Sequence, residues 1–247
     1  MPSVGGRELT IVPPGGLALA IKNESVGKVA AWDAARARSK QTGIGASQIG
    51  CPCTKQLLYA ARGVEKRKQV SDPWAAIVGS ACHSGPLHEA FRGSPDWLLD
   101  HKMEIGPGLY GTLDRYHIPT GCVVDDKVLG VEALKKMRKH GPGPQYRTQV
   151  HMYGFGMSRL GHDVRHVALC CWPRSGRMVD AYVWTEPYSD DVVETAFQRW
   201  YGLLEAAPAF TPEMFALVAK ADGPCGWCPY YDPELEKSNP ELACGGI

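Results

Sequence analysis

The chain has 247 residues, of which 44% are hydrophobic, so it is long enough to bury a full core. Its 27 Lys and Arg residues are matched by 26 Asp and Glu residues, and the net charge of +1 excludes a strong overall positive field that would attract nucleic acid. No apolar stretch is long enough to span a membrane and the N-terminus lacks the layout of a signal peptide, so we expect a cytoplasmic protein without membrane contacts.

The first third of the chain is expected to be mainly helical. Residues 1–27 begin rich in Gly and Pro and are interpreted as a loosely docked arm. Ser47 is a candidate N-cap because its hydroxyl can accept a hydrogen bond from the first helical turn. Helices are predicted over residues 28–40, residues 47–63, and residues 73–92 with an interruption at the Gly-Pro pair.

A β-hairpin is predicted over residues 111–127, with Pro119 and Gly121 in its turn. Asp114 lies in the first strand. Asp125 and Lys127 lie two residues apart in the second strand, on one face and about 7 Å apart. Two carboxylates and a lysine suit hydrolysis with a divalent metal, although solvated charge beside a turn is the more common explanation of such a pattern.

The register of this hairpin stays open from the residues alone. A three-residue loop at 119–121 would place Asp114 opposite Asp126. A one-residue bulge would instead place Asp114 opposite Asp125.

The second half of the chain alternates helices with a further hairpin. A short basic helix is predicted at 131–140 and a longer one at 145–160, and a third covers 190–206 with an apolar stripe. Residues 164–172 and 177–184 are predicted to form the second hairpin.

Nine cysteines in a chain without a secretion signal indicate reduced thiols or metal ligands rather than disulfides. Cys225 and Cys228 form a Cys-x-x-Cys pair that can hold one metal centre, and Cys244 follows after 15 intervening residues. Cys51 or Cys53 is the expected fourth ligand. Four thiolates suit zinc and an iron–sulfur cluster equally well, and a cysteine-based redox or metal sensor is a further interpretation.

The order of these motifs resembles the RecB-like branch of the PD-(D/E)XK nuclease superfamily. It is most similar to the iron–sulfur exonucleases associated with CRISPR adaptation and to their phage-encoded relatives. The resemblance spans residues 47–244. It is carried by Ser47-x-x-x-Cys51-Pro52, Gly79-x-x-x-His83, Gly111-Thr-Leu-Asp114, Val123-Val-Asp125-x-Lys127, Gln149-x-x-x-Tyr153 and Cys225-x-x-Cys228 with Cys244.

This resemblance implies a role for each residue. Lys127 would orient the attacking water. Gln149 and Tyr153, which share one helix face, would brace the lysine or contact DNA. The metal ligands for Mg²⁺ or Mn²⁺ would be His83, Asp114, Asp125 and the backbone carbonyl of Asp126, and the catalytic set would be Asp114, Asp125, Lys127, Gln149 and Tyr153. The resemblance also favours the register with Asp114 opposite Asp125.

The resemblance further implies a [4Fe–4S] cluster, with zinc as the alternative. Its ligands would be Cys51, Cys225, Cys228 and Cys244, with Cys51 preferred over Cys53 because a proline follows it. The gap between Cys228 and Cys244 is longer than the family usually has. Loss of the cluster would destabilise the fold because it closes a loop of most of the chain.

The expected fold is α/β, with a central mixed sheet flanked by helices in a restriction-endonuclease-like core. An iron–sulfur lobe would join the N- and C-terminal segments. The expected divisions are an N-terminal arm and helix at 1–46, a nuclease core at 47–207 whose residues 47–63 also serve the cluster lobe, and a C-terminal cysteine segment at 208–247.

The expected function is metal-dependent exonucleolytic cleavage of DNA, acting on single-stranded ends during recombination, repair or end processing. Basic runs at 62–68 and 135–140 are candidates for guiding the strand. The alternative is a DNA-binding subunit, stabilised by a cluster or zinc, that does not cut. The cytoplasm would be that of a bacterial host if a phage encodes the chain, and the existence of a homo-oligomer stays open.

Overall fold

The computed structural model describes residues 16–35, 44–66 and 72–218, together with residues 225, 228–232, 234, 237 and 244. The chain divides into two units, Met1–Lys40 and Gln41–Ile247. The first unit contains helix α1 (Gly16–Ala35), which starts before the predicted helix at 28–40; residues 36–40 lie outside the described part. No helix among the described residues is long and apolar enough to cross a bilayer.

The second unit is built on a five-stranded sheet whose spatial order follows the sequence. Three neighbouring pairs are antiparallel and the β3–β4 pair is parallel, so the sheet is mixed as predicted. The strands are β1 (Trp97–Gly106), β2 (Leu109–His117), β3 (Cys122–Leu129), β4 (His166–Pro173) and β5 (Tyr182–Pro187). A parallel pair needs a crossover, and two helices between β3 and β4 provide it.

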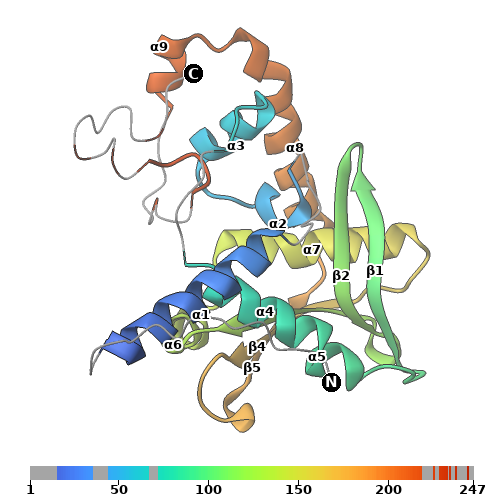
Figure 1. The fold of residues 1–247 in the computed structure, drawn as a ribbon. Coiled ribbons are helices and arrows are strands. Elements are labelled where there is room, and N and C mark those ends of the chain that lie inside the picture. Colours follow the sequence, from blue (N-terminus) through green and yellow to red (C-terminus); the bar gives the residue numbers. More distant parts are fainter. Residues whose placement is uncertain are drawn as a thin grey trace, which may run out of the picture. The chain divides into compact units, whose positions relative to one another are not determined.

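Strand β1 was not predicted from the sequence. Its charged and polar residues, among them Asp100 and Lys102, hide the apolar alternation that identifies a strand. β1 and β2 form a long hairpin at one edge of the sheet (Figure 1). This edge position explains why most of β1 is not deeply buried.

The helix expected at 47–63 is two helices, α2 (Ala46–Ile49) and α3 (Thr54–Ala61), separated at the Cys-Pro-Cys segment. Ser47 is not the N-cap, because α2 follows Gly45. Pro52 cannot continue a hydrogen-bonded helix, which accounts for the break. The region at 73–92 is interrupted where predicted, between α4 (Trp74–Ser84) and α5 (Pro86–Glu89).

Helix α7 (Pro144–Arg159) packs against strands β1 to β4 and supplies the largest share of buried helix residues. Helix α6 (Val131–His140) precedes it, and α8 (Asp190–Ala206) packs on its other side. Helix α9 (Pro212–Ala216) follows α8. The main core lies between the sheet and these helices, and includes Leu113, Val123, Val150 and Leu169.

Candidate active site

Strands β2 and β3 bring the two predicted carboxylates together. Arg115 of β2 pairs with Val124 of β3, so one further step along the ladder places Asp114 beside Asp125. This register comes from a turn longer than three residues, with a 3₁₀ turn over Ile118–Thr120 followed by Gly121 at φ 61°. Only glycine adopts that left-handed conformation without cost, and a Cβ there would also lie 2.3 Å from the Asp163 carbonyl oxygen.

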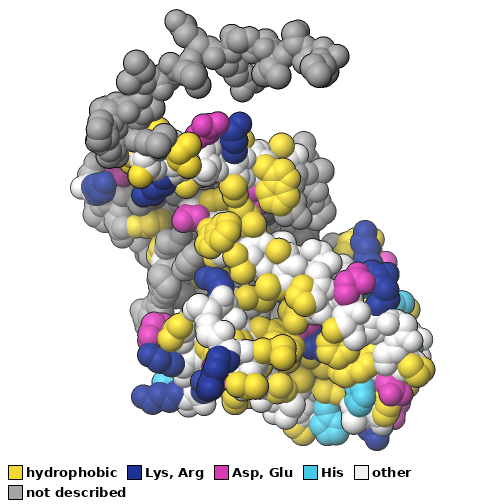
Figure 2. Space-filling view, turned by 60° about the horizontal axis from the view of Figure 1, so that its bottom comes forward, with side chains coloured by type: hydrophobic (Ala, Val, Ile, Leu, Met, Phe, Trp, Pro, Cys, Tyr) yellow, Lys and Arg dark blue, Asp and Glu magenta, His cyan; other side chains and the backbone are white. Residues whose placement is uncertain are grey.

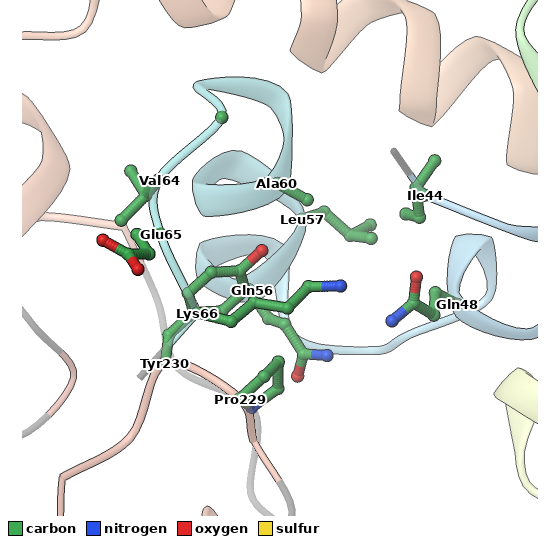
Figure 3. Close-up of a pocket in the computed structure, with 11 residues that line it drawn as sticks. Ile44, Gln48, Gln56, Leu57, Ala60, Val64, Glu65, Lys66, Pro229 and Tyr230 are labelled. Carbon is green, nitrogen blue, oxygen red and sulfur yellow. The ribbon is translucent and has the colours of Figure 1, made fainter. Parts of the chain in front are cut away.

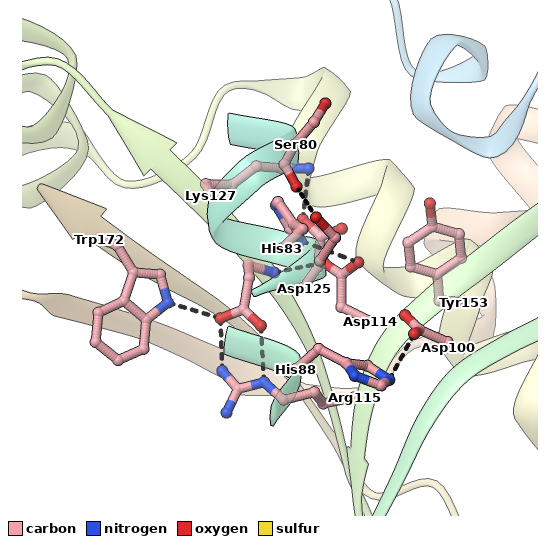
Figure 4. A network of polar contacts seen from close by, with 12 residues as sticks. Ser80, His83, His88, Asp100, Asp114, Arg115, Asp125, Lys127, Tyr153 and Trp172 are labelled. Carbon is pink, nitrogen blue, oxygen red and sulfur yellow. Dashed lines mark hydrogen bonds and ion pairs between the residues drawn. The ribbon is translucent and has the colours of Figure 1, made fainter. Parts of the chain in front are cut away.

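Lys127 lies beside Asp125 on the same strand, and its ammonium is 2.6 Å from Oδ2 of Asp125 (Figure 4). Gln149 of α7 connects the two residues. Its Oε1 accepts a hydrogen bond from Lys127 at 3.1 Å, and its Nε2 lies 3.2 Å from Oδ1 of Asp125. The same Nε2 donates to the hydroxyl of Tyr153 at 2.9 Å. The predicted Gln/Tyr pair therefore lies against the lysine and the carboxylate.

Burial strongly affects the charges of this group. Asp125 is 2% exposed, and burial raises its pKa to about 6, with the neighbouring Asp114 charge adding to the rise and Lys127 opposing it. Burial would lower the pKa of Lys127, but Asp125 and Asp114 outweigh that effect and the pKa is raised. Lys127 is therefore a protonated ammonium at neutral pH.

His83 reaches the site from helix α4. Its Nδ1 lies 3.5 Å from Oδ1 of Asp114, and this contact raises the pKa of His83 against the opposing effect of burial. Oδ2 of Asp114 accepts a hydrogen bond from the backbone N–H of Asp126 at 2.7 Å. The backbone of β3 thus holds the Asp114 carboxylate next to His83.

The Asp126 side chain lies away from this group. Its two oxygens accept hydrogen bonds from Arg115 at 2.7 and 2.5 Å, and the Trp172 indole donates to Oδ1 at 2.8 Å. The Arg115 guanidinium stacks on the Phe91 ring at 4.1 Å. The expectation for Asp126 as a ligand therefore rests on its backbone carbonyl alone, and its carboxylate belongs to a buried ion pair that was not predicted.

A second His–Asp pair adjoins the site. His88 of α5 places Nε2 at 2.7 Å from Oδ2 of Asp100 (Figure 4). The pairs Leu99–Arg115 and His101–Leu113 bracket Asp100, which therefore lies opposite Asp114 across the β1–β2 ladder. Asp100 has φ 48°, so the strand is distorted at this position. This pair was not predicted, because Asp100 lies in β1 and that strand was itself not predicted.

The donors present fit a divalent cation. Oδ2 of Asp125 is buried and accepts no well-aligned hydrogen bond from the described residues, although the Lys127 ammonium lies near it. The Lys127 ammonium compensates the charge of this carboxylate, and carboxylate oxygens are also the ligands that a divalent cation such as Mg²⁺ prefers. No group of three or more His, Cys, Asp or Glu side chains in the described ranges is yet close enough to hold a metal ion. A metal would have to draw Asp114, Asp125 and His83 together.

The predicted cysteine ligands meet in one cavity of about 700 Å³, which we call the cysteine pocket. Cys51 and Cys53 reach it from the α2–α3 segment, and Cys225, Cys228 and Cys244 from the C-terminal segment. Tyr146 also lines this pocket, and its ring lies 4.9 Å from the Lys127 ammonium, which connects the pocket to the candidate active site. Neither contact of Tyr146 was predicted.

A smaller hollow of about 400 Å³ also adjoins helix α3 (Figure 3). The described residues that line it include Glu65 and Lys66 but no cysteine. Arg62 of the first basic run donates to the backbone carbonyls of Ala207 and Phe210, so this arginine fastens α3 to the chain after α8. Residues 67 and 68 lie outside the described part.

In the second basic run, at 135–140, two side chains already contact other groups of the protein. Lys135 contacts Glu132 at 2.8 Å and Arg138 donates to the backbone carbonyl of Asp180. Lys136 lines the cysteine pocket. On the face shown in Figure 2, the basic side chains of described residues are scattered among acidic and apolar ones. This agrees with the near-neutral net charge.

No protein-family profile and no curated protein matches the sequence. Among solved structures, the chain is similar to an alkaline exonuclease, LHK-Exo, from Laribacter hongkongensis, with a TM-score of 0.51 and 10% identity over 69% of this chain and 90% of that one. LHK-Exo in complex with dAMP gives a TM-score of 0.50 and 12% identity over 68% and 89% of the chains. A phage-related exonuclease from Haemophilus somnus 129PT gives a TM-score of 0.46 and 10% identity over 65% of this chain and 82% of that one.

At this identity, the likeness to LHK-Exo shows a shared fold. The expected α/β core, a mixed sheet flanked by helices, is confirmed. The iron–sulfur lobe and the individual site residues stay predictions.

Proposed function

We propose that the chain is a Mg²⁺- or Mn²⁺-dependent DNA exonuclease of the PD-(D/E)XK type that acts on single-stranded ends. The observation that carries the proposal is the buried Asp125 carboxylate, whose Oδ2 has the Lys127 ammonium beside it and no well-aligned hydrogen bond from the described residues. Carboxylates that can hold a divalent cation, next to a lysine that can hold water, form an arrangement that suits metal-dependent phosphodiester hydrolysis. The fold shared with an alkaline exonuclease supports the same reaction class.

Some residues of the site would bind the cation, and others would position the nucleophile. Asp114, Asp125 and His83 would hold the cation, with the Asp126 carbonyl as a further oxygen donor. When bound, the cation supplies charge stabilisation at the scissile phosphate. Lys127 holds and orients the attacking water through its ammonium.

Gln149 fixes the Lys127 ammonium and the Asp125 carboxylate relative to each other, because it contacts both. Tyr153 accepts from the same amide and so limits its rotation. Burial of Asp125 and Gln149 keeps bulk water away from these contacts. We expect this preorganised arrangement to position the attacking water for the reaction.

We also propose that Cys225, Cys228, Cys244 and one cysteine of the 51–53 segment hold a metal centre, a [4Fe–4S] cluster or, as the alternative, zinc. The convergence of these cysteines on one pocket supports this part of the proposal. The centre would join the α2–α3 segment to the C-terminal segment and so stabilise the second unit.

The test is degradation of end-labelled single- and double-stranded DNA with Mn²⁺, comparing the wild type with Lys127→Ala. We expect the variant to lose roughly 10²–10⁴-fold in rate while its circular dichroism and metal content stay unchanged. A metal-loaded wild type that binds DNA but does not cut it would favour the non-cutting subunit. Equal activity in both proteins would place the reaction outside this site.

A further inference from the structure

The ring of Tyr146 is a contact of Lys127 that the proposed function does not yet use. The Lys127 ammonium lies over this ring, 4.9 Å from its centre. Tyr146 is in the first turn of α7, and Gln149 and Tyr153 follow it on the same helix. Residues at this spacing share one face of a helix, so Tyr146 extends the predicted Gln/Tyr pair by one turn towards the start of α7.

Two polar contacts do not fully fix the Lys127 ammonium. It lies 2.6 Å from Oδ2 of Asp125 and donates to Oε1 of Gln149 at 3.1 Å. An ammonium at the end of a flexible four-carbon stem can still pivot about two such contacts. The Tyr146 ring adds a third contact, because the negative face of an aromatic ring attracts a cation. The three contacts together restrict the ammonium to one position.

The residues on both sides of Tyr146 fix its backbone. Gln145 donates a hydrogen bond from Nε2 to the backbone carbonyl of Ser47 at 2.6 Å, which ties the start of α7 to α2. Thr148 packs closely against the end of α2, since a Cβ at Gly50 would lie 2.5 Å from the Cβ of Thr148. Packing this close leaves α7 little freedom to shift. The ring therefore reaches the ammonium from a rigid element.

The Tyr146 ring also forms a boundary between the Lys127 ammonium and the cysteine pocket. It contacts the ammonium and lines the pocket, whereas Lys127 is not among the described residues that line it. The Lys127 side chain is only 17% exposed. A ring at this boundary keeps solvent on the pocket side away from the ammonium, and charges shielded from water interact more strongly with each other. The ring should therefore strengthen the contact of Lys127 with Asp125.

We propose that Tyr146 is a positioning residue of the candidate active site, whose ring holds the Lys127 ammonium against Asp125 and Gln149 and shields it on the side of the cysteine pocket. This inference rests on the proposed function, because it names a further residue that prepares Lys127 to hold the attacking water. Tyr146 acts through the face of its ring and not through its hydroxyl group.

The first experiment compares the kinetics of single-stranded DNA degradation by the wild type, Tyr146→Leu and the conservative variant Tyr146→Phe. We expect Tyr146→Leu to lower kcat about 2- to 30-fold with little change in KM, a range that corresponds to the usual strength of a cation–π contact. Tyr146→Phe keeps the ring face and should regain most of this loss. A raised KM with unchanged kcat in Tyr146→Leu would overturn the proposal and make the ring a contact of a substrate base.

Because a leucine could also loosen the packing of α7, the second experiment keeps the shape of the ring. Phenylalanines with increasing numbers of fluorine atoms are incorporated in place of Tyr146. Fluorine withdraws electron density from the ring face and so weakens its attraction for a cation. We expect kcat to fall stepwise along the series while the melting temperature changes little. A kcat that stays constant along the series would overturn the cation contact and make Tyr146 a packing residue only.

A third experiment measures the position of Lys127 without DNA. Reductive methylation followed by mass spectrometry gives the rate at which Lys127 reacts in the wild type, Tyr146→Leu and Tyr146→Phe. We expect Lys127 to react faster in Tyr146→Leu than in the other two proteins, whereas Lys139, which is exposed on α6, should react equally in all three. This difference in a wild type that does not cut DNA would support the contact and contradict only the proposed function. Equal rates for Lys127 in all three proteins would overturn the role of Tyr146.

Discussion

Asp125 and Asp126 are neighbours in strand β3, yet their carboxylates lie in two separate networks. Asp125 contacts Gln149 and Lys127, whereas Asp126 is bound by Arg115 and Trp172. Successive side chains of a strand point to opposite faces of the sheet. Asp125 therefore belongs to the candidate site, whereas Asp126 belongs to a structural ion pair. The two residues should therefore respond differently to substitution.

Arg115→Ala is expected to destabilise the protein by about 3–5 kcal/mol, because it leaves the Asp126 carboxylate buried without its partner. Asp126 is 1% exposed and Arg115 4% exposed, so water cannot replace the lost contact. The double variant Arg115→Met with Asp126→Leu should lose much less than Arg115→Ala. Urea denaturation measures both, and equal losses would show that the pair itself is not the source of stability.

The β2–β3 hairpin and helix α8 could be predicted from the sequence, because the patterns that identify them lie within each segment. Asp114, Asp125 and Lys127 could be placed on a hairpin because turn residues and period-two spacing are local. The helix Asp190–Ala206 was predicted with its observed bounds, since its apolar stripe is regular.

Contacts between distant segments could not be predicted in this way. The ion pair of Arg115 with Asp126 and the position of Asp100 opposite Asp114 depend on the pairing of β1 with β2. Likewise, the packing of α2 against α7 brings together segments that are far apart in the sequence. Neither feature leaves a pattern in the local sequence.

Gln149→Leu is expected to lower kcat by about 10–100-fold, because residues that orient a catalytic group typically have effects of this size. The change frees the Lys127 ammonium and leaves the Tyr153 hydroxyl without its donor. Tyr153→Phe removes only the hydrogen bond between the Gln149 amide and the Tyr153 hydroxyl, so it should lower kcat by less than Gln149→Leu does. Gln198→Leu, at an exposed position on α8 where the amide donates to Glu194 of the same helix, is the matched control. A larger loss in Tyr153→Phe than in Gln149→Leu would contradict this order.

His151 should make the stability of the protein depend on pH. It is fully buried, its Nδ1 accepts from the backbone N–H of Ser189, and its Nε2 lies 2.6 Å from Glu186. Burial lowers its pKa despite the opposing effect of Glu186, so the unfolded chain binds a proton at a higher pH than the native protein does. The free energy of unfolding should therefore fall as the pH drops below about 6.5, by at most about 1.4 kcal/mol per pH unit.

His151→Gln should flatten this dependence, whereas His140→Gln, at an exposed position on α6, should leave it unchanged. The measurement is chemical denaturation at a series of pH values between 5 and 8, a range of about three units around the ordinary histidine pKa. An identical slope in wild type and His151→Gln would assign the pH dependence to other groups.

Gly111 connects the sheet to the candidate active site through Tyr153. A Cβ at Gly111 would lie 2.6 Å from Cε1 of the Tyr153 ring and 2.9 Å from Cδ1 of Ile105, which is closer than side-chain atoms can approach. Gly111→Ala is therefore expected to displace the Tyr153 ring, and with it the Gln149 amide that holds Lys127. We expect a decrease in kcat of about 10-fold with little change in the KM for DNA, because Gly111 acts only by positioning other residues.

The double variant Gly111→Ala with Tyr153→Leu separates this effect from a general loss of stability. A leucine removes the ring atoms that the new Cβ would meet, so the double variant should be no less active than Tyr153→Leu alone. Kinetics of DNA degradation and thermal denaturation of all four proteins complete the cycle. Additive losses in kcat would mean that Gly111 acts on the site by a route that does not involve Tyr153.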